Sequence, residues 1–314
     1  MLSYFFLVIG FLLLIFSGDF LVKGAVSIAL KLRLSTLVIG MTIVSFGTSA
    51  PELLVSIKAA MGGHPDISIG SVVGSNISNI ALILGITAMV FPISVSKATL
   101  RIDWPMMMLS TLMFVVVVMD GELSAWEGVL FLVFLVSFIA WLIRNSRKTS
   151  VLPAAVDEVN EGEKKLPLWK GVALVGTGAL GLVFGADLML KGAIEIARAY
   201  DVSERIIGLT IVAFGTSLPE LITSCVAAFR KEADISIGNL IGSNIFNILA
   251  ILGTTAVIHP ISVSHSIINS DNYILLGITL LVFPLMYFGN KIGRIKGLVL
   301  FLVYAVYLLY LITQ

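Results

Sequence analysis

The sequence has 314 residues, of which 58% are hydrophobic and only 12% are charged, and its mean hydropathy is +1.05. A soluble globular domain carries about 25% charged residues, so this composition predicts an integral membrane protein surrounded by the lipid bilayer. The formal net charge of +1 gives no reason to expect a nucleic-acid partner, and no obligate protein partner is evident. The single cysteine, Cys225, excludes an intrachain disulfide and a cysteine-based metal cluster.

Apolar segments of about 20 residues are typical of membrane helices, and they follow one another along the chain. We expect helices at 3–30, 36–60, 69–91, 104–119 and 126–143, and then at 169–198, 204–229, 237–258, 272–288 and 296–312. The first segment runs past signal-peptide length and has no basic residues before it, so we expect it to be a membrane helix. The predicted fold is an all-α membrane protein with ten transmembrane helices.

Two stretches of this sequence occur twice. FGTSAPELLVS begins at Phe46 and FGTSLPELITS at Phe214, while DISIGSVVGSNISNI begins at Asp66 and DISIGNLIGSNIFNI at Asp234. Both pairs have the same offset of 168 residues, which divides the chain into a first half (1–144), a polar linker (145–168) and a second half (169–314). Each half has five predicted helices. Because five is odd, the second half enters the membrane from the opposite side, which predicts inverted repeats.

Positive charges are distributed unevenly between the predicted loops. One set of loops carries Lys31, Arg33, Lys97, Arg101, Arg144, Arg147, Lys148, Lys164, Lys165, Lys170, Arg230, Lys231, Lys291, Arg294 and Lys296. The other set carries only Lys58, Arg198 and Arg205. Cytoplasmic loops of membrane proteins are enriched in lysine and arginine. We therefore expect a multi-pass cell-membrane protein with a cytoplasmic linker and both termini outside.

Polar side chains interrupt two of the apolar segments in each half. Thr48, Ser49 and Glu52 stand at i, i+1 and i+4, so they share one face of the second helix, and Pro51 frees backbone carbonyls beside them. The seventh helix repeats this pattern, and the third and eighth helices each add a serine and an asparagine four residues apart: Thr216, Ser217, Pro219 and Glu220; Ser75 and Asn79; Ser243 and Asn247. An ionisable residue inside a membrane span indicates a functional site. Glu52 and its repeat are therefore the strongest candidates.

Two further repeated patterns predict structure rather than chemistry. Glycines four residues apart let neighbouring helices approach closely, and they occur at Gly70, Gly74, Gly238 and Gly242. Acidic and basic residues four apart form ion pairs within one helix, and they occur at Asp19 with Lys23 and at Asp187 with Lys191.

The candidate ligands are all oxygen donors: two carboxylates, six hydroxyls, two side-chain amides and some freed carbonyls. Hard cations such as Ca²⁺ and Na⁺ prefer oxygen, and Ca²⁺ takes about 6–8 oxygen ligands. The absence of histidine and thiolate from this set argues against Zn²⁺ or Cu⁺ as the preferred ion. Two carboxylates also balance the charge of one divalent ion.

The paired motifs, GTSAPE with GSNISN and GTSLPE with GSNIFN, resemble the two alpha-repeats of the cation/calcium exchanger superfamily, in particular those of prokaryotic sodium/calcium exchangers. The resemblance covers essentially the whole chain. It implies a transporter rather than an enzyme, which exchanges about three Na⁺ for one Ca²⁺ by alternating access and needs no cofactor. It also implies that the first and sixth helices slide across the core as a gate, in which Gly24 and Gly192 take part.

The same resemblance implies a role for each polar residue. The central Ca²⁺ ligands would be Glu52, Glu220, Thr48 and Thr216. One Na⁺ site would contain Ser49, Ser75 and the carbonyl of Ser45. Its mirror image would contain Ser217, Ser243 and the carbonyl of Ala213. Asn79 and Asn247 would line the middle. Potassium-dependent relatives carry aspartate where Asn247 stands, so this chain has one carboxylate fewer, which argues against K⁺ co-transport.

Three other functions are compatible with parts of the pattern. A calcium/proton exchanger is the nearest alternative, because Glu52 and Glu220 could carry protons, while the flanking serines favour Na⁺. A cation channel fits two repeats around one site less well than alternating access does. An intramembrane hydrolase is disfavoured, because the three histidines stand at predicted loop ends, away from the buried hydroxyls and carboxylates: His64, His259 and His265.

Overall fold

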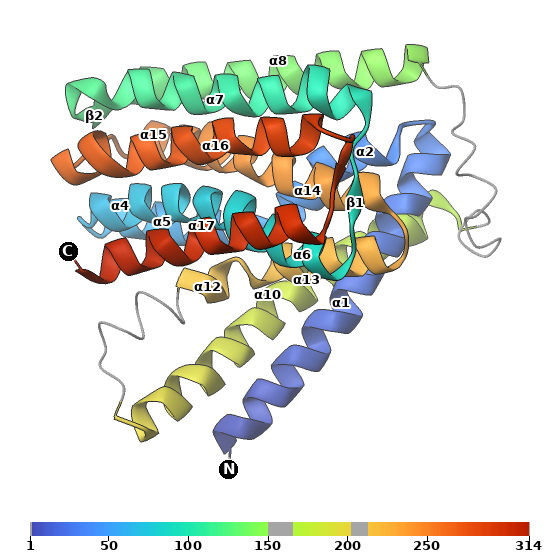
Figure 1. The fold of residues 1–314 in the computed structure, drawn as a ribbon, viewed down its shortest axis with the longest axis horizontal. Helices are drawn as coiled ribbons and strands as arrows, with labels where there is room; N and C mark the ends of the chain where they lie inside the picture. The colour runs from blue at the N-terminus through green and yellow to red at the C-terminus, as the bar shows by residue number, and fades with distance from the viewer. Residues whose placement is uncertain (1, 150–165, 202–212, 314) are drawn as a thin grey trace.

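The computed structural model describes residues 2–149, 166–201 and 213–313, and these residues are mostly helical (Figure 1). The helices of the first half are α1 (Leu2–Leu32), α2 (Thr36–Ile39), α3 (Ser45–Thr48), α4 (Ala50–Met61), α5 (Pro65–Ile77), α6 (Leu84–Val90), α7 (Trp104–Val117) and α8 (Ala125–Thr149). Those of the second half are α10 (Leu168–Ala199), α12 (Ala213–Thr216), α13 (Leu218–Phe229), α14 (Ala233–Phe246), α15 (Gly253–Ile258), α16 (Asn272–Tyr287) and α17 (Arg294–Thr313). Short π-helical segments connect several of them, at Gly40–Val44, Ser78–Ile83, Thr99–Asp103, Asn247–Leu252 and Ile267–Asp271.

Eight helices of the described residues are long and apolar enough to cross a membrane, and the bent pair Thr36–Thr48 and Ala50–Met61 would make a ninth. These nine coincide with nine of the ten predicted segments. The tenth, 204–229, is described only from Ala213 onward, and its first part lies outside the described residues. The predicted linker begins later than expected, because α8 continues to Thr149, and 150–165 also lies outside the described residues.

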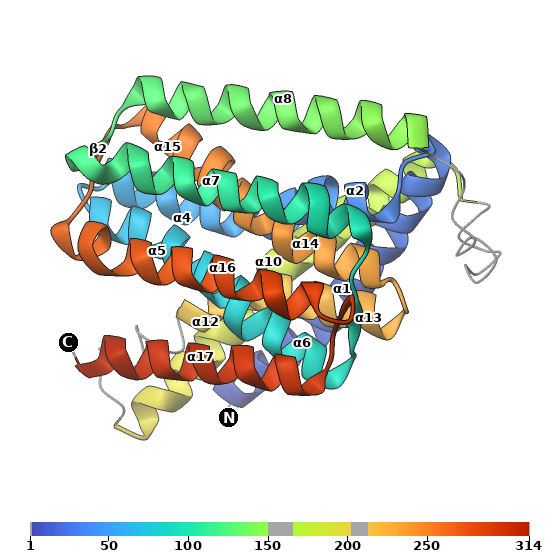
Figure 2. The ribbon, with the colours of Figure 1, turned by 45° about the horizontal axis from the view of Figure 1, so that its top comes forward.

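The helices form a bundle with two distinct parts. In Figure 1, α8 lies at one edge of the bundle, and α1 and α10 form a tilted pair at the other. Figure 2, turned by 45°, shows α7, α16 and α17 on the near side of α5 and α14. The spans that contain α5 and α14 are the most buried of the candidate membrane spans. The candidate serines and asparagines of the third and eighth predicted helices, Ser75, Asn79, Ser243 and Asn247, therefore lie in the innermost spans.

Two short antiparallel strand pairs join the halves to each other. Strand β1 (Ile93–Ser94) of the first half pairs with β4 (Lys291–Ile292) of the second, and β2 (Glu122–Leu123) pairs with β3 (Ile261–Ser262). Both pairs satisfy backbone groups in loops between helices. Neither half completes these loops without the other.

Glycines bring the backbones of α1 and α10 into direct contact. A Cβ atom added at Gly10 would lie 2.6 Å from the backbone nitrogen of Met189, and one added at Gly178 would lie 2.7 Å from that of Leu21. Gly24 and Gly192, which sequence comparison associates with the gate, occupy the same interface: their added Cβ atoms would lie 2.7 Å and 2.5 Å from carbonyl oxygens of the facing helix. Small residues allow this close approach of membrane helices.

The second and seventh membrane segments are broken next to their prolines. The first break is at Ser49 (φ −88°, ψ 7°), where the segment Thr36–Thr48 and helix α4 meet at an angle of 47°. The second break is at Ser217 (φ −90°, ψ 5°). The prediction of a loosened helix at Pro51 is confirmed, although the break precedes the proline. Proline lacks an N–H and is preferred in the first turn of a helix. Pro51 therefore lies in the first turn of α4 and does not interrupt a continuous helix.

Other predicted features have different outcomes. The ion pairs are confirmed, with Asp19–Lys23 at 2.6 Å and Asp187–Lys191 at 2.7 Å. The glycine spacing is confirmed on α14, where Gly238 and Gly242 lie against the segment from Leu37 to Ser45. The equivalent segment of the second half lies largely outside the described residues, so for Gly70 and Gly74 the close approach remains a prediction.

Candidate functional site

The polar residues of both halves meet at the centre of the bundle. Glu52 in the first turn of α4 is 2% exposed, and Glu220 in the first turn of α13 is 0% exposed. Ser49, three residues before Glu52, contacts the Glu220 carboxylate, which brings the two glutamates to one region of the bundle. Each glutamate follows a helix break by three residues, so the two breaks position one carboxylate from each half at the same place.

Hydrogen bonds at this centre run between the halves. The Ser49 hydroxyl donates to Oε1 of Glu220 over 3.1 Å. The hydroxyl oxygens of Thr48 and Ser243 lie 3.5 Å apart. The family resemblance assigns Ser49 and Ser243 to two separate flanking sites. Both hydroxyls contact residues of the opposite half, so both repeats contribute to the same site.

The remaining predicted residues lie on the same elements. Ser45 and Ser75 are buried, and the Ser45 carbonyl accepts a hydrogen bond from the Thr48 hydroxyl at 3.2 Å. Thr216 ends α12 and is half-buried. Ala213 begins α12, and its side chain lies outside the described part of the structure. The assignment of these groups to particular Na⁺ or Ca²⁺ positions remains a prediction.

Several buried polar atoms of this centre have no hydrogen-bond partner among the described residues. They include one oxygen of each glutamate, the Ser217 hydroxyl and both amide atoms of two asparagines: Glu52 Oε2, Glu220 Oε2, Ser217 Oγ, and Oδ1 and Nδ2 of Asn79 and Asn247. Leaving such a group unpaired costs about 1–3 kcal/mol. A hard cation would satisfy the oxygens, since carboxylate, hydroxyl and amide oxygens are its preferred ligands.

The composition of the site separates it from a transition-metal centre. Among residues 2–149, 166–201 and 213–313, no three His, Cys, Asp or Glu side chains come together. The two glutamates therefore carry the charge of the centre, and the other polar side chains gathered there are neutral. This arrangement matches an ion that is bound and released rather than one held permanently by soft ligands.

The two middle asparagines are placed by a feature that the sequence did not predict. Asn79 lies in the π-helical segment Ser78–Ile83, and Asn247 begins the segment Asn247–Leu252. Widened turns of this kind are frequent at functional sites, because the extra residue changes the direction of the side chains around it. Both asparagines are buried beside the carboxylates' helices.

Two polar clusters at the site were missed by the sequence analysis. Asn239 on α14 is 0% exposed, and it contacts Thr48 over 3.2 Å and Ser224 over 3.1 Å. The hydroxyls of Ser56 and Ser68 in the first half and Thr255 in the second form a buried cluster with distances of 2.8 and 3.0 Å. The available signal for Asn239 was its difference from Ser71, its equivalent in the first repeat.

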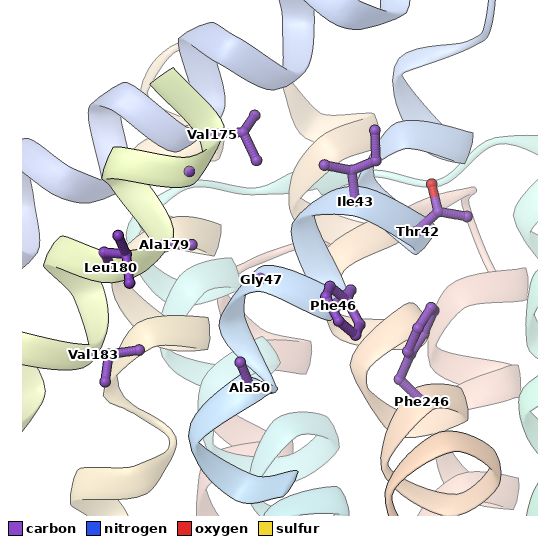
Figure 3. Close-up of a pocket in the computed structure, with 11 residues that line it drawn as sticks. Thr42, Ile43, Phe46, Gly47, Ala50, Val175, Ala179, Leu180, Val183 and Phe246 are labelled. Carbon is purple, nitrogen blue, oxygen red and sulfur yellow. The ribbon is translucent and has the colours of Figure 1, made fainter. Parts of the chain in front are cut away.

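Cavities next to the breaks are apolar and separate from the polar centre. Figure 3 shows a cavity of about 530 Å³ between α3, α4 and α10, where Phe46, Ala50, Ala179 and Leu180 form part of the wall. A second cavity, of about 540 Å³, is lined by the equivalent residues of the second half, Phe214, Gly215 and Leu218, together with parts of α10 and α17. In the first cavity the Thr42 hydroxyl donates to the carbonyl of Val38 over 2.7 Å, so the wall offers few ligands for a cation.

The fold and the site together define a class: a helical membrane protein with two related halves and one buried, oxygen-lined site between them. The sequence matches the sodium/calcium exchanger protein family over residues 2–144 and 170–313. The chain therefore belongs to the sodium/calcium exchanger family. It is a transporter, and its activity is cation/Ca²⁺ exchange.

Individual relatives agree with this assignment. The chain is 38% identical to a putative antiporter, CaxA, of Alkalimonas amylolytica over 96% of both sequences. It is 31% identical to the sodium/calcium exchanger MaX1 of Methanosarcina acetivorans over 97% of both. Among solved structures, the sodium-calcium exchanger NCX_Mj soaked with Na⁺ and Sr²⁺ superposes with a TM-score of 0.82 at 34% identity over 97% of both chains.

Proposed function

We propose that the protein is a secondary active antiporter that exchanges Na⁺ for Ca²⁺ across the cell membrane by alternating access. The observation that carries this proposal is the pair of buried carboxylates, Glu52 and Glu220, one from each half, surrounded by neutral oxygen ligands. Two carboxylates neutralise one Ca²⁺, so the loaded centre carries no net charge through the membrane. The name of the relative MaX1 supports Na⁺ as the counter-ion.

In this proposal each ligand has a defined task. Glu52, Glu220, Thr48 and Thr216 hold Ca²⁺. Ser49 and Ser75 with the Ser45 carbonyl form one Na⁺ site, and Ser217 and Ser243 with the Ala213 carbonyl form the other. Asn79 and Asn247 line the middle with neutral amides. The flanking Na⁺ sites adjoin the same two carboxylates, since Ser49 already contacts Glu220. Binding of one ion therefore disfavours binding of the other, which is the requirement for exchange.

Hydrogen bonding gives the chain a means of releasing one carboxylate at a time. In the described conformation Ser49 donates its proton to Glu220. A cation between the carboxylates would compete for that Glu220 oxygen, and the Ser49 hydroxyl would then turn and present its lone pairs, since a hydroxyl has one proton and two lone pairs. Ligand exchange within the site would thus follow from a rotation of a side chain.

Ten membrane helices in two inverted repeats would give this site its two faces. Contacts between the halves support the arrangement, because they occur in matched pairs. Gly10 lies against Met189, and their equivalents Gly178 and Leu21 lie against each other. Asn76 donates over 3.3 Å to the carbonyl of its own equivalent, Asn244. A two-fold axis that exchanges the halves requires such pairs, and the odd number of helices in each half would place that axis in the membrane plane.

The loop charges give the proposed orientation. The basic loops face the cytoplasm together with the linker, and both termini are outside. Attachment of a fluorescent protein to the linker or to the C-terminus tests this directly. Quenching of the C-terminal label, but not of the linker label, by an impermeant quencher added outside cells is the expected result. The reverse pattern would contradict the orientation.

Uptake of ⁴⁵Ca²⁺ into proteoliposomes tests the exchange itself. Liposomes loaded with Na⁺ should accumulate Ca²⁺ when diluted into Na⁺-free medium, and liposomes with Na⁺ on both sides should not. Uptake that follows an imposed pH gradient and ignores Na⁺ would favour calcium/proton exchange instead. Single-channel currents in planar bilayers would indicate a channel.

The charge moved in each cycle distinguishes the proposed stoichiometry. Exchange of three Na⁺ for one Ca²⁺ carries one net positive charge, and a potential of 100 mV changes the energy of one charge by about 2.3 kcal/mol. An inside-positive potential, set with valinomycin and K⁺, should therefore accelerate Na⁺-driven Ca²⁺ uptake. The two flanking Na⁺ sites and the two-carboxylate centre together offer three positions for Na⁺. Uptake that is insensitive to the sign of the potential would indicate a two-for-one exchange and remove one of the two flanking sites.

A further inference from the structure

One buried amide joins the two halves at the proposed site. Asn239, on α14 of the second half, is 0% exposed. Its Oδ1 accepts from the Thr48 hydroxyl of the first half over 3.2 Å, and its Nδ2 donates to Ser224 over 3.1 Å. Its backbone carbonyl accepts from the Ser45 hydroxyl over 3.0 Å. The side chain and backbone of Asn239 therefore hold two residues of the α3 segment that precedes Glu52.

The equivalent position in the first repeat is built differently. Ser71 stands where Asn239 stands, and its hydroxyl donates to the Ser68 carbonyl of its own helix over 2.9 Å. Ser56, the equivalent of Ser224, is bound by Ser68 and Thr255 rather than by the residue at position 71. The two repeats thus differ at this position both in sequence and in hydrogen bonding.

The geometry around Thr48 determines which face its hydroxyl offers to an ion. A threonine hydroxyl has one proton and two lone pairs. The two groups that receive the Thr48 proton, the Ser45 carbonyl and Oδ1 of Asn239, are both acceptors at 3.2 Å. Nδ2 of Asn239 donates to Ser224, and in this orientation of the amide its oxygen faces Thr48. With its proton directed at these acceptors, the Thr48 hydroxyl presents its lone pairs to a cation on the side of Ser243, whose hydroxyl lies 3.5 Å away.

We propose that Asn239 is a positioning residue of the ion site, which orients the Thr48 hydroxyl as a cation ligand. Its equivalent, Ser71, bonds its own helix instead. The inference rests on the proposed role of Thr48 in binding Ca²⁺. A preoriented ligand does not have to turn when the ion arrives, so its loss weakens binding more than it slows the movement of the loaded protein. Asn239 itself makes no contact with the ion.

The test compares Asn239→Ala with Ser71→Ala, the same truncation at the equivalent position. Purified variants are reconstituted in proteoliposomes, and Na⁺-driven ⁴⁵Ca²⁺ uptake is measured over a series of Ca²⁺ concentrations. Loss of one positioning hydrogen bond is expected to raise the KM for Ca²⁺ about three- to tenfold in Asn239→Ala, with little change in the maximal rate. Ser71→Ala is expected to stay within about twofold of the parent KM. Equal KM values for the two variants would overturn the proposal.

A double-mutant cycle distinguishes positioning from general support of the fold. If Asn239 acts through Thr48, Asn239→Ala adds no further loss in Ca²⁺ binding when Thr48→Ala is already present. Binding of ⁴⁵Ca²⁺ to the detergent-purified variants is the readout, because it does not require transport. The proposal would be overturned if Asn239→Ala weakened Ca²⁺ binding in the Thr48→Ala protein by the same factor as in the parent protein. Asn239→Ser, which copies the first repeat, replaces Asn239→Ala if that variant does not fold.

The same binding measurement separates failure of this inference from failure of the proposed function. A parent protein that binds Ca²⁺ but shows no Na⁺-driven uptake would contradict sodium/calcium exchange, while the cycle would still decide the role of Asn239. A parent that exchanges normally, with Thr48 and Asn239 effects that simply add, would leave the function intact and reject the positioning role.

Discussion

The two halves of the protein have nearly the same site motifs but different contacts around them. Ser49 of the first half donates to Glu220, whereas the hydroxyl of its equivalent, Ser217, has no hydrogen-bond partner within the described part of the chain. The same sequence element is therefore in two environments within one molecule. The proposed alternating-access cycle requires such a difference, because each half would take up the arrangement of the other in turn.

The helix pair formed by α1 and α10 shows a second difference. Asp19 on α1 forms an ion pair with Lys23 and also, at 2.6 Å, with Arg230 at the end of α13. Asp187 on α10 pairs with Lys191, and the residue equivalent to Arg230 is Gly62, which carries no charge. The α1 helix is thus attached by charge to the core of the opposite half, while the corresponding attachment of α10 is not encoded. Such contacts favour one position of the pair over the other.

The largest expected effect comes from the feature that the halves share. Glu52→Gln or Glu220→Gln should each abolish Ca²⁺ exchange, because one carboxylate leaves a divalent ion half-neutralised where the effective dielectric constant is low. Uptake of ⁴⁵Ca²⁺ in proteoliposomes measures the loss. Asp187→Asn, which removes an exposed carboxylate of the same chain, is the control and should retain exchange. Normal Ca²⁺ transport in both glutamine variants would refute the proposed site.

A smaller but clear effect is expected where α1 and α10 touch. Gly10→Ala would place a Cβ 2.6 Å from the backbone of α10, and overpacking of this kind costs about 1–3 kcal/mol. The melting temperature in detergent should fall, and exchange should slow. The matched control is Gly176→Ala on α10, where the added Cβ meets no described atom within 4 Å and alanine favours the helix. A Gly10→Ala protein as stable as the control would show that the pair is loosely packed.

Replacing the middle asparagines by aspartate, one at a time, adds a negative charge to one half and then to the other. Asn247→Asp and Asn79→Asp each place a third carboxylate beside two buried ones, where like charges repel. We expect exchange in each variant to become dependent on an additional cation, either H⁺ or K⁺. Uptake measured with and without K⁺ across a pH series checks this. An unchanged ion profile in both variants would place these asparagines outside the ion site.

The smallest expected effect concerns the ion pair between α1 and α13. Asp19 and Arg230 are 27% and 18% exposed, so the pair is partly screened, and Arg230→Gln should shift the balance between the two positions of the helices by about 1 kcal/mol or less. In vesicles of one orientation, the ratio of Ca²⁺ entry to Ca²⁺ exit rates should change up to about fivefold. Lys191→Gln, on the half without this attachment, should change the ratio less. Equal ratios would remove the ion pair from the mechanism.

Much of this architecture could be predicted from the sequence because it depends on local patterns. The apolar segments, the duplicated motifs, the helix breaks near Pro51 and Pro219 and the Asp19–Lys23 pair each involve residues close together in the chain. Asn239 and Arg230 could not be assigned in this way. Their partners, Thr48 and Asp19, are about two hundred residues away, and only the folded arrangement brings them together. The sequence shows that Asn239 and Arg230 differ from their equivalents in the first repeat, Ser71 and Gly62. It does not show which residues they contact, so their roles could not be predicted.

The paired strands have a consequence for how the protein is made. Strand β1 of the first half finds its partner only in β4, near the end of the chain, and Glu52 faces Glu220 of the second half. Synthesis proceeds at about 5–20 residues per second, so the first five helices wait roughly ten seconds or longer with their loop unpaired and their carboxylate without its ion site. During that interval the first half depends on the insertion machinery and chaperones of the membrane. A gene split at the linker would therefore yield two fragments that are each short-lived alone and stable only when they are produced together.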